Sequence, residues 1–128
     1  MRYALLLWLL FSPFFTQKSD LELITNAVKH GSAQEVAAMF MTSVDMTINN
    51  VENIYSSQQA ELVLADFFKN NHPRNAQLLH QISSSPSFHF IVLMVDTSTG
   101  TYRMAFSLKS SAGKFKISEL RIEAEKTK

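Results

Sequence analysis

In the second half of the chain, from Arg74 onward, apolar and polar residues alternate as they do in β-strands, and no helical period is present. Apolar side chains recur at every second position, which is typical of a strand with one buried face. Turn sequences at Ser83–Pro86, Thr99-Gly100 and Ala112-Gly113 separate the alternating segments. Strands joined by such short turns pair antiparallel. We therefore predict a four-stranded antiparallel meander of residues 75–85, 87–98, 101–110 and 114–125.

The last of these strands changes phase within its length. Phe115 and Ile117 are in phase with each other, whereas Leu120 and Ile122 are shifted by one residue. A shift of one residue moves side chains to the opposite face of a sheet. One extra residue near Ser118-Glu119 would restore the burial of all four, so the sequence predicts a β-bulge that bends the sheet there.

The first half carries three helix starts of one type, a serine followed three residues later by Glu or Gln. This is the capping-box pattern, in which the serine side chain accepts from the third backbone amide. Apolar residues follow each start at helical spacing, and Gly31 and Pro73 lie beyond the ends of the first and third helices. The three starts are Ser19–Glu22, Ser32–Glu35 and Ser56–Gln59, and the second is followed by a stripe of Val36, Ala37 and Phe40.

A short hairpin lies between the second and third helices. Residues 44–48 alternate, Asn49-Asn50 forms a turn, and residues 51–55 form the returning strand. Helices that precede strands favour an α+β domain with the helices on one face of the sheet. The predicted fold is three N-terminal helices with a short hairpin, packed on a bent four-stranded antiparallel sheet.

The adjacent pair Phe67-Phe68 in the third helix is predicted to be structural. Neighbouring residues on a helix diverge by about 100°. One ring should therefore fill the space beneath the sheet while the other packs against the first helices.

The N-terminal sixteen residues resemble an export signal. Arg2 precedes an apolar run from Ala4 to Phe11, which is shorter than the roughly 20 residues needed to span a bilayer. We expect a signal peptide over residues 1–16, cleaved near Thr16-Gln17, and one domain over residues 17–128. An uncleaved anchor is the alternative. The expected location is periplasmic or secreted, with no membrane span after cleavage.

Composition excludes several chemistries. The chain has no cysteine, which excludes thiol catalysis, disulfides and zinc–thiolate sites. Eleven basic and eleven acidic residues remain after residue 16, so the net charge of this part is zero. It creates no electrostatic attraction for nucleic acid, and no nucleic-acid partner is expected. Lys109, Lys114 and Lys116 gather near one turn and are interpreted as the solvent face of a hairpin.

Three stretches carry a resemblance to a known family: "ITNAVKHGSAQEVAAMF", "VDMTINNVENIYSSQQAELVLADFFKNNHP" and "YRMAFSLKSSAGKFKISELRIE". Together they resemble domain-of-unknown-function family 4783, exported proteins of Bacteroidetes, over about residues 21 to 123. The resemblance implies a cystatin-like or nuclear-transport-factor-2-like (NTF2-like) cone and an exported location, and no assigned activity. His80 is followed by Gln81 here, where the family usually has a His-Gly pair.

Enzymes with this kind of cone use an Asp or His base facing a Tyr or acid donor in the pocket. The candidate pocket residues here are Tyr55, His80, His89 and Tyr102, with Asp45 and Asp96 as further acidic side chains. Each also has a structural interpretation, as a packed ring, an exposed strand residue or a turn cap. The histidines form no metal-binding pair, and neither a metal nor a cofactor is expected.

Two functions are therefore compared. The first is an exported, non-catalytic binding or interaction domain for an unknown small molecule or protein, with a homodimer formed through the sheet face as one form of interaction. The second is a small isomerase-like or lyase-like enzyme. An open pocket containing two of the four candidates would favour the enzyme, whereas a pocket filled by Phe67, Phe90, Met94 and Phe106 would favour binding.

Overall fold

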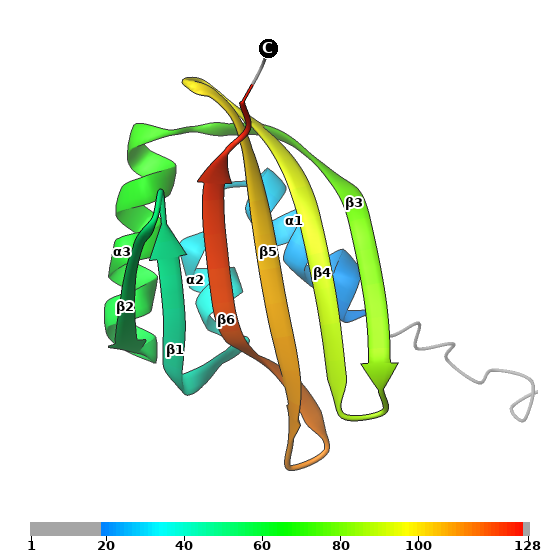
Figure 1. The fold of residues 1–128 in the computed structure, drawn as a ribbon. Coiled ribbons are helices and arrows are strands. Elements are labelled where there is room, and N and C mark those ends of the chain that lie inside the picture. The colour runs from blue at the N-terminus through cyan, green and yellow to red at the C-terminus, as the bar shows by residue number, and fades with distance from the viewer. Residues whose placement is uncertain (1–18, 127–128) are drawn as a thin grey trace, which may run out of the picture.

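The computed structural model describes residues 19–126, which form one sheet covered on its inner face by three helices (Figure 1). The elements in chain order are α1 (Asp20–Lys29), α2 (Ala33–Ala37), β1 (Phe40–Ile48), β2 (Val51–Ser56), α3 (Ser57–Asn70), β3 (Pro73–Ser85), β4 (Phe88–Thr97), β5 (Gly100–Ser111) and β6 (Lys114–Ala124). The expected signal peptide lies outside the described residues. Within them, no helix has the length and apolar character needed to cross a membrane.

The sheet is six-stranded and mixed, in the order β2-β1-β6-β5-β4-β3. The prediction of a separate hairpin packed on a four-stranded antiparallel sheet is therefore wrong. β1 pairs in parallel with β6, for example Met46 with Leu120, and this pairing merges the hairpin into the meander. The description of all three helices as N-terminal is also wrong, because α3 follows β2, whereas the position of the hairpin between the second and third helices agrees with the prediction.

The three helices begin at the cap residues that the sequence predicts. The side chains of Ser19, Ser32 and Ser56 accept hydrogen bonds from the third amide that follows each of them. At Ser56 the box is complete, because the Gln59 side chain also accepts from the Ser56 backbone amide. The second helix ends earlier than predicted, and Phe40 begins β1 instead. The cause is a long-range contact, since the Met39 carbonyl accepts from the Ile117 amide of β6 at 2.7 Å.

The predicted bulge in β6 is confirmed. Ser107 of β5 pairs with Glu119, while Leu108 pairs with Ile117, so Ser118 is the extra residue. Its hydroxyl donates to the Ser107 carbonyl at 3.2 Å. Because of this extra residue, Ile117 and Leu120 both point into the core and both are fully buried.

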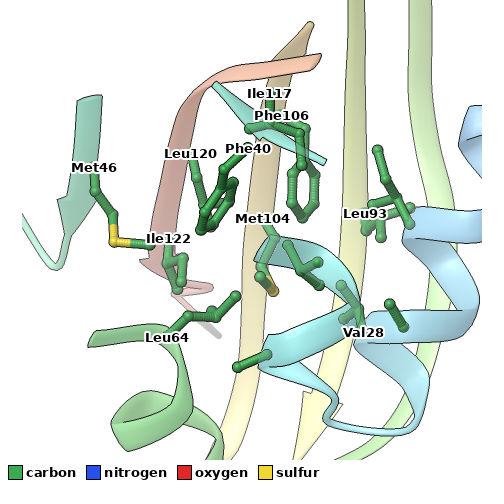
Figure 2. Packing of buried hydrophobic residues seen from close by; sticks show 14 of the residues in the cluster. Val28, Phe40, Met46, Leu64, Leu93, Met104, Phe106, Ile117, Leu120 and Ile122 are labelled. Carbon is green, nitrogen blue, oxygen red and sulfur yellow. The ribbon is translucent and has the colours of Figure 1, made fainter. Parts of the chain in front are cut away.

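The core fills the concave side of the sheet, between the strands and the helices (Figure 2). Met104 and Phe106 of β5 lie at its centre, with Leu93 of β4 and Val28 of α1 on one side. Leu64 of α3 and Met46 of β1 close the other side. The inward-facing side chains that do not belong to this core therefore lie near the two ends of the strands.

Candidate functional site

Tyr102 lies at the end of the sheet near the β4–β5 turn and is held in a hydrogen-bond network. Its hydroxyl donates to Asn71 Oδ1 at 3.0 Å, and Thr99 Oγ1 donates to the same oxygen. Asn71 is the C-cap of α3, and its Nδ2 donates to the Phe67 carbonyl at 3.0 Å. The Tyr102 hydroxyl therefore connects the end of α3 to the β4–β5 turn.

His89 lies at the opposite end of the inner face. It pairs with Leu108 of β5, and its ring stacks on Phe115 of β6 with centroids 4.0 Å apart. Tyr102 and Leu108 are six residues apart on β5, which corresponds to about 20 Å along a strand. His89 and Tyr102 therefore lie too far apart to act on the same small molecule.

The other two candidates lie elsewhere on the sheet. Tyr55 belongs to β2, pairs with Val44 and packs half-buried against the core. His80 is exposed on β3 and pairs with Val92, whose neighbours Ile91 and Leu93 point into the core. His80 therefore projects from the outer face. The structure does not bring the four candidates into one pocket.

The four apolar side chains whose convergence in a pocket would favour binding divide between the two faces of the sheet. Phe67 and Phe106 are buried inside, and the Phe67 ring meets the Tyr102 ring edge-on at 5.0 Å. Phe90 and Met94 do not join them. They alternate with Ile91, Leu93 and Val95, which belong to the core, so they project from the outer face.

A groove formed by two adjoining depressions lies between α1, the α2–β1 connection and the β5–β6 hairpin. The first has a volume of about 430 Å³ and the second about 390 Å³, and both are lined by Leu23, Ala38 and Met39. Phe115 adds an aromatic wall to the first depression. We call this feature the α1–hairpin groove. Its size is that of a site for a small molecule.

Residues of opposite charge line the α1–hairpin groove on its two sides. Asp20 and Glu35 belong to the helices, whereas Lys114 and Lys116 belong to the hairpin. Such a groove offers apolar contact at its floor and fixed charges to orient a ligand. His89 adjoins it through its stacking on Phe115. In residues 19–126 no three His, Asp or Glu side chains gather as a metal site would require.

Sequence reasoning missed the α1–hairpin groove. Leu23 precedes the buried Ile24 on α1, and Met39 precedes the buried Phe40, so both resemble ordinary flanking residues. Lys109 and Lys114 are exposed, in agreement with their interpretation as a solvent face, whereas Lys116 is half-buried. No local pattern indicates that α1 and the β5–β6 hairpin would meet across Met39.

The fold is shared with solved structures of low sequence identity. A DUF4783 family protein from Bacteroides uniformis has a TM-score of 0.81 and 24% identity, with 85% of this chain and 100% of that chain covered. A cystatin-like domain of unknown function from Nostoc punctiforme has a TM-score of 0.67 and 11% identity, covering 84% and 74%. An NTF-2-like protein of unknown function from Silicibacter pomeroyi has a TM-score of 0.61 and 10% identity, covering 82% and 89%.

Comparison with curated protein sequences gave no match. The family model described as "Domain of unknown function (DUF4783)" matches residues 21–123, which span every helix and strand except the extreme ends of α1 and β6. That description assigns no activity. The chain belongs to the DUF4783 family and has the α+β fold seen in cystatin-like and NTF2-like proteins.

Proposed function

We propose that this protein is an exported, non-catalytic binding module that holds a small amphipathic ligand in the α1–hairpin groove. One observation carries the proposal: an apolar floor lies between oppositely charged sides, and of the four Tyr and His candidates only His89 adjoins it, through Phe115. General acid–base catalysis needs a base and a donor within hydrogen-bond reach of one substrate. Tyr102 near the start of β5 and His89 of β4, which pairs with Leu108 near the end of β5, do not meet that requirement.

The geometry of the α1–hairpin groove favours a ligand with an apolar body and an anionic end. Leu23, Met39 and Phe115 offer carbon surface to the body. Lys114 and Lys116 lie on the hairpin side and would attract a carboxylate, sulfonate or phosphate group. Asp20 and Glu35 on the helix side would repel that group, and the ligand would bind in one orientation.

The proposal is tested with anilinonaphthalene sulfonate, an aromatic dye with one anionic group. We expect saturable fluorescence enhancement with the folded protein and amide NMR shifts concentrated at Leu23, Met39 and Phe115. Leu23→Asp should abolish the response, because it places a carboxylate on the apolar floor. Leu23 is already 44% exposed, so the variant should still fold.

The matched control is Leu62→Asp, which makes the same chemical change on the exposed side of α3, at a leucine 71% exposed. It should bind the dye as the unmodified protein does. Equal loss of binding in both variants, or no saturable binding in the unmodified protein, would contradict the assignment of the groove. Thermal melts of both variants show whether any loss of binding comes from unfolding.

Export is part of the proposal and depends on residues 1–16. Arg2, the short apolar run and the break at Ser12-Pro13 have the order of a cleavable signal. An exported module without cysteine is stabilised by its apolar core and not by disulfides.

A further inference from the structure

β3 is an edge of the sheet and, after Arg74, lacks the charged side chains that commonly protect an edge. It is 13 residues long, pairs with β4 on one side, and has no strand on the other (Figure 1). Natural edge strands commonly carry charged side chains, which oppose pairing with another chain. Residues 75–95, which include all of β3 after Arg74, contain no Asp, Glu, Lys or Arg.

The same strand exposes large apolar side chains. Leu78, Leu79 and Ile82 are 46%, 38% and 53% exposed. Register shifts follow Leu78 and Ser83, so residues 80–83 form a regular run between two irregular points. Gln81 and Ile82 lie at the centre of that run.

We propose that β3 is the edge through which two copies of this chain pair, antiparallel and about a two-fold axis near Gln81. The absence of charged side chains on β3 after Arg74 favours a second copy of this chain as the partner. An uncharged strand meets itself without like-charge repulsion, whereas a charged strand would find no opposite charge on β3. The pairing would also shelter Leu78, Leu79 and Ile82 of both copies.

Pairing at this edge differs from dimerisation through the outer face of the sheet. That face carries Arg103 and Arg121, which form ion pairs with Glu125 and Glu123 at 3.3 and 3.2 Å. All four side chains retain substantial contact with solvent. Face-to-face packing would remove water from these charges, whereas edge pairing leaves them hydrated. The inference does not depend on the ligand of the α1–hairpin groove.

The test measures association by sedimentation velocity over a concentration series up to the millimolar range. We expect a monomer–dimer equilibrium for the unmodified protein. Gln81→Lys, at an exposed position, should raise the dimer dissociation constant about tenfold or more, because it places two like charges close to the axis. Asn53→Lys makes a similar change on the other edge strand, β2, and should leave the constant unchanged.

A charge-exchange experiment identifies the contact. Gln81→Lys mixed with Gln81→Glu should form a heterodimer at concentrations where each variant alone is monomeric. Three results would overturn the inference: a monomer at every concentration, a dimer insensitive to Gln81→Lys, or a dimer sensitive to Asn53→Lys. Thermal melts confirm that each variant is folded, so loss of the dimer can be assigned to the edge.

Discussion

Truncation of Phe67 to alanine should destabilise the fold by about 3–5 kcal/mol. Phe67 is 6% exposed at the C-terminal end of α3, and its ring meets Tyr102 edge-on at 5.0 Å and Phe68 at 6.1 Å. The side chain thus joins the last turn of α3 to β5. Its loss removes contacts on both the helix and the sheet.

The magnitude has three contributions. Exposing a buried phenylalanine costs about 2–3 kcal/mol of transfer free energy. Losing an edge-on aromatic partner adds about 0.5–1.5 kcal/mol. The cavity left behind adds a further amount that depends on how far Phe68 and Tyr102 move to fill it. These contributions together reach the 3–5 kcal/mol expected for such a truncation.

Urea unfolding followed by circular dichroism measures this loss, and the melting temperature should fall by at least about 10 °C. Phe67→Leu is the matched control, because it keeps most of the apolar volume and removes only the aromatic contact. It should lose about 1–2 kcal/mol. If Phe67→Ala unfolds at the same urea concentration as the unmodified protein, the placement of this ring between α3 and β5 is refuted.

Two further predictions concern the α3 cap and the N-terminus. Tyr102→Phe should lower the free energy of unfolding by about 0.5–1.5 kcal/mol, because Asn71 Oδ1 loses one donor, and unchanged urea unfolding would contradict a structural role for this hydroxyl. The full chain expressed in a Gram-negative host should appear in the periplasmic or culture fraction with an intact mass lacking residues 1–16. Leu7→Arg, which interrupts the apolar run, should retain the full mass in the cells, and a full-length exported chain would contradict cleavage.

The sequence by itself determined the features that depend on neighbouring residues. Capping at Ser19, Ser32 and Ser56 is decided by a side chain and an amide three residues away. The extra residue Ser118 was visible as a change in apolar phase, because burial on one face requires alternation. Family membership likewise rests on sequence patterns spread over residues 21–123.

Tertiary structure alone decided the contacts between distant segments. The parallel pairing of β1 with β6 joins residues more than 70 positions apart, and no local turn specifies it. The same pairing takes Phe40 out of the predicted helix and into β1. The four candidate residues do not form one site for a similar reason. Alternation assigns a side chain to a face of the sheet but not to a position along it. Tyr102 therefore lies beneath the end of α3 while His89 stacks on Phe115, and the groove is formed by residues that no sequence pattern connects.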